Sequence, residues 1–118
     1  MMNDPKQLLN EFMEGLQSFE DEAPEQTQAF MNLLGASYKD EALSNKTKEL
    51  ISVAIGAYNR CEYCIAFHVY KALEAGATKE EIYESAMVSV AFGGGPSMAY
   101  SVTLVKKSVE AFLPEFQS

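Results

Sequence analysis

The sequence predicts an all-α protein of one domain, with about six helices and a central antiparallel helix hairpin. Three observations point to this class. Apolar residues recur at helical spacing along the chain, helix start and stop signals divide it into segments, and no segment reads as a convincing strand. With 118 residues and 47% apolar content, the chain suits one core. We therefore expect a single domain over residues 1–118.

Two helices are expected in the N-terminal third. Asp4 can cap the first helix and Pro5 suits its first position, so this helix covers roughly 5–20. A second proline can open a helix over about 24–34, which Gly35 would end. The apolar residues that recur here at helical spacing are Leu8, Leu9, Phe12, Met13, Leu16, Phe19, Phe30, Leu33 and Leu34.

The middle of the chain predicts two helices joined by a short turn. Ser44 can cap the first, whose apolar pattern continues until Tyr58-Asn59-Arg60 interrupts it. The second begins near Cys61 and stops at Gly76, a residue type that often follows a helix end. We expect these two helices to pair as the antiparallel hairpin.

Two more helices are expected near the C-terminus. Thr78 and Glu81 match a capping box and start a fifth helix. The segment Gly93-Gly94-Gly95-Pro96 ends it and opens a sixth, which runs to about Leu113. A phosphate-binding loop is not supported at the glycines, because no strand precedes them and no Lys-Ser or Lys-Thr pair follows.

Charge and hydropathy narrow the function classes. The net charge is −8, and residues 1–43 hold nine acidic against two basic residues. Such a surface opposes phosphate backbones and anionic lipids, so we expect neither nucleic acid nor membrane as a partner. There is no uncharged apolar run of about 18 residues and no secretory signal, which predicts a soluble cytoplasmic protein. The third and fifth helices are apolar around much of their circumference, which favours burial against other subunits in a homo-oligomer.

Both cysteines and the single histidine lie within eight positions, at Cys61, Cys64 and His68. On a helix, residues three and four apart share a face, so Cys64 would lie between the other two. A helix N-terminus and a nearby imidazole both favour the reactive thiolate. By spacing, Cys64 is the better placed nucleophile and Cys61 the resolving thiol. Because the dithiol itself carries two electrons, no bound cofactor is expected.

Glu49 is a candidate third member of this site. In an antiparallel hairpin that turns at Asn59-Arg60, Glu49 and His68 would lie at roughly 15 and 12 Å from the turn, at a rise of about 1.5 Å per residue. Glu49 could then orient His68 or take its proton through a water.

The order Glu49, Cys61, Cys64, His68 resembles the Glu…Cys-x-x-Cys-x-x-x-His pattern of the alkylhydroperoxidase D-like (AhpD-like) proteins of the carboxymuconolactone decarboxylase superfamily. The resemblance extends over roughly residues 30–112, through Ala75-Gly76-Ala77-Thr78, Glu81-Ile82 and Gly95-Pro96. It implies an all-α fold that assembles into trimers or hexamers, with thiol peroxidase or disulfide reductase activity.

The resemblance also implies a role for each site residue. Cys64 would attack the peroxide, Cys61 would resolve the sulfenic acid to a disulfide, and His68 and Glu49 would relay protons. A lipoyl-bearing or other dithiol partner would reduce the disulfide. One position departs from the pattern: the best-known peroxidases carry a second histidine where this chain has Tyr63. The decarboxylases of the superfamily generally lack the cysteine pair, which makes lactone decarboxylation improbable.

Three other interpretations remain open from the residues alone. The cysteines could be small buried hydrophobes, since free cysteine is often buried. Cys61, Cys64, His68 and Glu49 could bind a structural zinc ion, although such sites usually draw ligands from two separated segments, and we expect no metal. The chain could also be a helical assembly module without redox activity.

Overall fold

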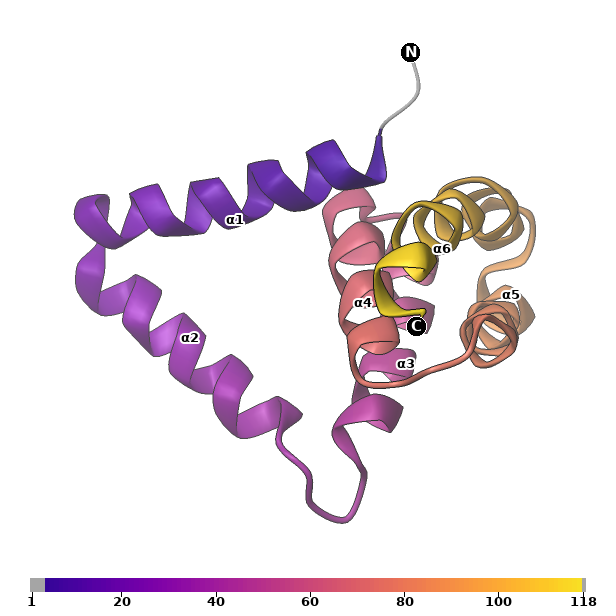
Figure 1. Cartoon of the computed structure of the whole chain (residues 1–118), viewed down its shortest axis with the longest axis horizontal. Helices are drawn as coiled ribbons and strands as arrows, with labels where there is room; N and C mark the ends of the chain where they lie inside the picture. Colours follow the sequence, from indigo (N-terminus) through magenta and orange to yellow (C-terminus); the bar gives the residue numbers. More distant parts are fainter. Residues whose placement is uncertain (1–3, 118) are drawn as a thin grey trace.

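The computed structural model describes residues 4–117, and all secondary structure in this part of the chain is helical. Figure 1 shows α1 and α2 extending to one side, α3 and α4 in the middle, and α5 and α6 on the other side. The elements are α1 (Pro5–Glu22), α2 (Pro24–Tyr38), α3 (Asn45–Asn59), α4 (Glu62–Glu74), α5 (Lys79–Tyr100), the π-helix η1 (Ser101–Val105), α6 (Lys106–Phe112) and the 3₁₀-helix η2 (Leu113–Phe116). The predicted all-α class is confirmed.

We call residues 5–38, which form α1 and α2, the N-terminal arm. The first turn of α1 is stabilised as predicted, because the Asp4 carboxylate accepts the Lys6 N–H at 3.3 Å and proline occupies the next position. Gly35 does not end α2, contrary to prediction. The helix continues to Tyr38, since an exposed glycine inside a helix costs only about 1 kcal/mol of stability. At the end of α2, the Asn45 side chain donates a hydrogen bond to the Tyr38 carbonyl at 2.6 Å.

The helices α3 and α4 run antiparallel and approach each other closely. Ser44 caps α3 by accepting the Thr47 N–H at 3.1 Å, and the chain reverses at Arg60, whose φ of 56° is left-handed. A Cβ atom on Gly56 would lie 3.3 Å from the Cys64 Cβ, so glycine at this position permits the approach. The close approach brings the backbone of α3 next to the first turn of α4.

The C-terminal part of the chain is one helical path with a sharp bend. Thr78 and Glu81 form the predicted capping box, and Gly76 follows the end of α4 with a φ of 94°. Gly94 (φ 63°, ψ −140°) bends the chain inside α5, within the glycine segment predicted to separate two helices. Because helical turns then continue through η1, α6 and η2 to Phe116, the predicted count of about six separate helices is inexact.

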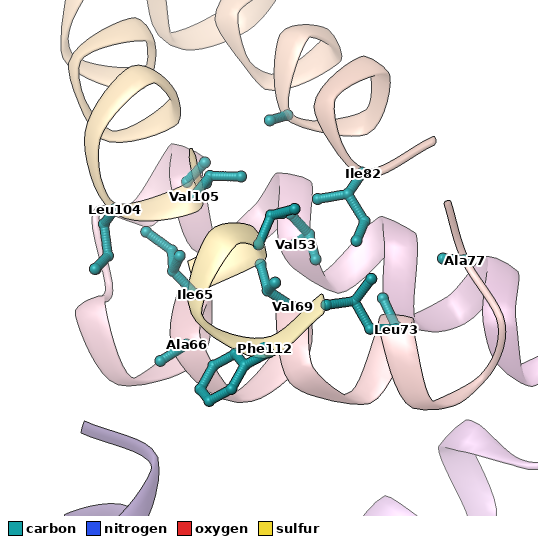
Figure 2. Close-up of a cluster of buried hydrophobic side chains, with 14 of the residues drawn as sticks. Val53, Ile65, Ala66, Val69, Leu73, Ala77, Ile82, Leu104, Val105 and Phe112 are labelled. Carbon is teal, nitrogen blue, oxygen red and sulfur yellow. The ribbon is translucent and has the colours of Figure 1, made fainter. Parts of the chain in front are cut away.

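We call residues 45–116, from α3 to η2, the helical body; its hydrophobic core lies where α3, α4, α5 and the C-terminal segment meet (Figure 2). Side chains with no solvent exposure come from each of these segments, and they include Val53, Ile65, Val69, Ile82 and Val105. Phe112, which is 1% exposed, belongs to the same cluster (Figure 2). Burial of these side chains supplies the main force that holds α4 in place.

The stretch Lys79–Phe116 is long and apolar enough to cross a membrane by length and composition alone. The bend at Gly94 divides it, however. The part before the bend, 79–93, is roughly 22 Å long at about 1.5 Å per residue, which is shorter than the hydrocarbon core of about 30 Å. The part after the bend carries Lys106, Lys107 and Glu110. We therefore assign this stretch to the fold of the helical body.

Candidate functional site

The two cysteines are joined by a disulfide at the start of α4. Cys61 is the N-cap residue of this helix, and its Sγ accepts the Cys64 N–H at 3.2 Å. Both residues are partly exposed. The sulfur of Cys61 therefore occupies the place usually taken by a capping oxygen, where unpaired amides and the helix dipole favour negative charge. The expected helix-end effect thus acts on Cys61 directly, as well as on Cys64 in the first turn.

The structure brings Glu49 and His68 together, as the hairpin geometry predicts. The His68 Nδ1 lies 2.7 Å from the Glu49 Oε1, and the Glu49 side chain is only 3% exposed. A carboxylate can only accept, so Nδ1 carries the proton in this contact, and a neutral imidazole then has a free lone pair on Nε2. Glu49 is therefore not a solvated surface residue.

His68 lies one helical turn after Cys64 in the unbroken helix α4, so the two share a face. All four predicted site residues thus come from the hairpin. The disulfide joins Cys61 to Cys64, and a hydrogen bond joins Glu49 to His68. The two pairs are related through α4, in which Cys64 and His68 are four residues apart. This arrangement places the imidazole on the same face of α4 as Cys64, one helical turn away.

Aromatic rings enclose the imidazole, and the sequence alone does not identify one of them. The Tyr38 ring stacks on the His68 ring with centroids 5.6 Å apart and planes 18° apart. Phe67 meets the imidazole edge-on at 5.0 Å and is itself contacted by Phe12 at 5.3 Å. Tyr38 was missed because α2 was expected to end near residue 34. The signal that could have found it is the absence of any helix-breaking residue between Gly35 and Tyr38.

Tyr63 stands where the peroxidases that this sequence resembles carry a second histidine. Its side chain contacts the N-terminal arm. Its hydroxyl donates to the Glu11 Oε1 at 3.0 Å. This hydrogen bond, together with the negative charge of Glu11, raises the pKa of Tyr63 above its ordinary value. A groove of about 360 Å³ beside this contact is lined by Glu11, Phe12, Gly15, Leu16, Phe19 and Tyr63.

The zinc alternative would need a set of neighbouring ligands. Within residues 4–117, no group of three or more His, Cys, Asp or Glu side chains is arranged to hold a metal ion. Both sulfurs are engaged in the disulfide, whereas a zinc ligand must be a free thiolate.

Comparison with known proteins gives the family. Residues 24–107 match the model of the carboxymuconolactone decarboxylase family. An uncharacterised protein of Cupriavidus necator is 32% identical over 101 residues, which is 86% of this chain and 89% of that protein. An alkyl hydroperoxide reductase AhpD of Corynebacterium aurimucosum is 39% identical over 59 residues, which is half of this chain but only 31% of that protein.

Solved structures agree with these relatives. A carboxymuconolactone decarboxylase family protein of Legionella pneumophila superimposes with a TM-score of 0.84 at 34% identity, covering 99% of this chain and 100% of that one. A family member of Thermotoga maritima gives 0.70 at 26% identity, covering 91% and 97%. With the paired cysteines and the Glu49–His68 contact in place, the chain is an AhpD-like member of the carboxymuconolactone decarboxylase family.

Proposed function

We propose that this protein is a thiol-dependent peroxidase and disulfide oxidoreductase, with Cys64, Cys61, His68 and Glu49 as its catalytic residues. The observation that carries the proposal is the Cys61–Cys64 disulfide at the start of α4, one turn before a histidine that is hydrogen-bonded to a buried carboxylate. A dithiol that can close, next to an oriented base, is the minimum set for two-electron reduction of a peroxide.

In the reduced enzyme, His68 accepts the thiol proton of Cys64 through Nε2, and Glu49 stabilises the resulting imidazolium. The Cys64 thiolate attacks the terminal peroxide oxygen. The O–O bond breaks, a sulfenic acid forms on Cys64, and the alkoxide leaves as an alcohol after taking the proton back from His68. His68 then takes the proton of the Cys61 thiol, and the Cys61 thiolate attacks the sulfenic sulfur. The disulfide forms, and the departing hydroxide takes that proton from His68 and leaves as water.

A dithiol partner returns the enzyme to the reduced state. Its first thiolate opens the disulfide through a mixed disulfide, and its second thiol completes the exchange, so two electrons and two protons reach the enzyme. A lipoyl-bearing protein has the required chemistry. The cycle needs a compartment in which dithiols stay reduced, which agrees with the expected cytoplasmic location.

The relatives support this proposal and also limit it. One relative is an alkyl hydroperoxide reductase AhpD, but this chain spans about a third of its length. The Thermotoga maritima family member has been suggested to act in an antioxidative response. In this chain, Tyr63 takes the place of the second histidine and is bonded to Glu11. We therefore expect slower turnover with peroxides than in family members that have both histidines.

We also propose that the protein forms a homo-oligomer, a trimer or hexamer. The outer surfaces of α3 and α5 form an apolar groove, with side chains such as Ile55 (53% exposed), Val88 (59%) and Phe92 (82%) facing solvent. Exposed apolar patches of this kind usually mark interfaces. Replacing Phe92 with Asp should lower the mass measured by light scattering, and an unchanged mass would place the interface elsewhere.

A peroxide-consumption assay with dihydrolipoamide as reductant tests the main proposal. Wild-type enzyme should consume cumene hydroperoxide, and Cys64→Ser should lose this activity completely. Ser85→Ala on α5 removes a hydroxyl bonded only to the Glu81 carbonyl and serves as a matched control that keeps activity. If Cys64→Ser were as active as the wild type, the proposal would fail and an assembly role would remain.

Alkylation kinetics test the relay separately. The rate at which iodoacetamide modifies the reduced protein, measured against pH, should show a Cys64 thiol pKa well below the usual value of about 8.5. His68→Ala should raise it. An unshifted wild-type curve would contradict a proton acceptor at His68.

A further inference from the structure

We propose that Tyr38 is a positioning residue for His68. In this role, its ring holds the imidazole in the one orientation that keeps Nδ1 on Glu49 and leaves Nε2 available as the base. The inference rests on the proposed function for its chemical meaning, but its physical basis is independent of any activity. That basis is a ring contact from one end of the N-terminal arm onto the site in the hairpin.

A single hydrogen bond does not fix an imidazole ring. The contact between Nδ1 and the Glu49 Oε1 at 2.7 Å sets one direction, but a hydrogen bond tolerates a range of angles, so the ring can still tilt about its Cβ–Cγ bond. The Tyr38 ring lies nearly parallel to the imidazole, at 18°, and covers one of its faces. The Phe67 ring meets it at 81°. Contacts in two nearly perpendicular planes remove the remaining rotation.

Tyr38 is itself held firmly. Its hydroxyl is hydrogen-bonded to the Ser52 Oγ, and Ser52 donates its own proton to the Lys48 carbonyl at 2.9 Å. Because a serine hydroxyl has only one proton, Tyr38 must be the donor to Ser52. The Tyr38 carbonyl also accepts from the Asn45 side chain at 2.6 Å. Side chain and backbone are thus tied to α3 at separate points.

These ties begin on the turn of α3 that carries Glu49. The Ser52 hydroxyl, which accepts from Tyr38, and the Lys48 carbonyl, which accepts from Ser52, lie on either side of Glu49 in the sequence. The ring that covers the imidazole is therefore tied to the turn of α3 that carries the Glu49 carboxylate. Since Ser52 is 8% exposed, water competes little for its hydroxyl. This arrangement explains why a residue far from both cysteines in the sequence would affect them.

Imidazole NMR on the intact protein tests the proposal directly, because His68 is the single histidine and gives one set of signals. In wild-type protein, nuclear Overhauser effects should connect the Tyr38 and His68 ring protons, and the nitrogen shifts should show the tautomer with its proton on Nδ1. Tyr38→Leu should abolish the ring-current shift of the imidazole protons and mix the two tautomers.

Two matched variants separate the ring from the hydroxyl. Tyr38→Phe keeps the stacked face but loses the hydrogen bond to Ser52, so its imidazole signals should lie between those of the wild type and Tyr38→Leu, and Ser52→Ala, which removes only the acceptor of the hydroxyl, should match Tyr38→Phe. In the alkylation assay, Tyr38→Leu should slow modification of Cys64 at neutral pH by about two- to tenfold, the range expected for one aromatic contact. Tyr38→Phe should change it by less than about twofold.

Three results would overturn the proposal: absent ring-to-ring effects in the wild type, unchanged imidazole signals in Tyr38→Leu, or Tyr38→Phe as impaired as Tyr38→Leu. The first needs no variant, so it decides the question even if Tyr38→Leu does not fold. Failure of peroxide consumption in the wild type would instead count against the proposed function. The imidazole measurements do not depend on peroxide consumption, so the role of Tyr38 would still be decided by them.

Discussion

The N-terminal arm and the hairpin of α3 and α4 use similar apolar sequences in different ways. In the hairpin, side chains such as Val53, Ile65 and Val69 are fully buried. In the arm, Phe19 (57% exposed) and Leu33 (62%) face solvent. The proposed site residues come from the hairpin, whereas the arm contacts them and their neighbour Tyr63 through Tyr38 and Glu11. Helical periodicity alone therefore does not show which helices form the core, because the burial of an apolar face depends on which other elements pack against it.

The largest expected effect is on the free energy of unfolding, when an apolar side chain in each region is shortened to alanine. Ile65→Ala, in the buried hairpin, should lower the free energy of unfolding by about 2–5 kcal/mol, since it leaves a cavity. Leu33→Ala, in the exposed part of the arm, should change it by no more than about 0.5 kcal/mol. Urea unfolding of both variants measures the two values. A Leu33→Ala loss as large as that of Ile65→Ala would mean that another subunit buries the arm.

The second test uses glycines and should give effects of opposite sign. A methyl group at Gly56 would lie 3.3 Å from the Cys64 Cβ and 3.4 Å from the Ile65 backbone N, so Gly56→Ala should destabilise by about 1–3 kcal/mol. Gly35 is inside α2 with nothing within 4 Å of such a methyl, so Gly35→Ala should stabilise by about 0.5–1 kcal/mol. Thermal melts of the two variants measure this, and shifts in the same direction would contradict the contrast.

A smaller, local effect is expected where the two regions touch. Tyr63→Phe removes the hydrogen bond to Glu11 and should speed amide hydrogen exchange in the middle of α1, while α3 stays unchanged. The pKa of Tyr63 is raised in the folded protein, so this contribution is present at neutral pH and is lost as the pH rises through the raised value. The variant and the wild type should therefore converge at strongly alkaline pH.

Tyr58→Phe is the control for that measurement, because Tyr58 is similarly exposed and makes no hydrogen bond through its hydroxyl within the described part of the chain. Its α1 exchange rates should equal those of the wild type. Equal rates in Tyr63→Phe as well would show that the hydrogen bond does not hold the arm.

The smallest effect is expected at the cap of α5. The Thr78 backbone N–H, with Lys46 nearby, lowers the pKa of the Glu81 carboxyl. Stability from the charged form is therefore present above the unfolded value of about 4.5 and is lost as the pH falls through the lowered folded value. Glu81→Gln keeps a capping side chain but loses the charge, so its melting temperature should be slightly lower at neutral pH and equal at low pH. Glu84→Gln, on the same helix outside the cap, is the control.

Local signals in the sequence predicted local structure well. Ser44, and the pair Thr78 and Glu81, cap their helices as expected, because each cap is decided by residues three apart. The neighbourhood of Glu49 and His68 was also predictable, since the rise per residue of two paired helices around a short turn places both at a similar height.

Contacts that depend on tertiary structure were not predictable in the same way. Gly35 was expected to end α2, but the helix runs on until the Asn45 side chain takes the Tyr38 carbonyl. Nothing in the sequence near His68 indicates that a ring from α2 covers it. The helix α4 begins near Cys61 as predicted, but the sequence did not indicate that the Cys61 sulfur itself caps the helix by accepting the Cys64 N–H.

The left-handed backbone at Arg60 has one more consequence. An arginine in this conformation costs roughly 1–2 kcal/mol that a glycine would not, yet it restricts the chain immediately before Cys61 far more than glycine does. A restricted backbone before Cys61 limits the positions that the Cys61 thiol can reach once the disulfide is reduced. It therefore raises the effective molarity of the Cys61 thiol toward Cys64. We therefore expect Arg60, which is not one of the proposed catalytic residues, to influence how readily the Cys61–Cys64 disulfide re-forms after reduction.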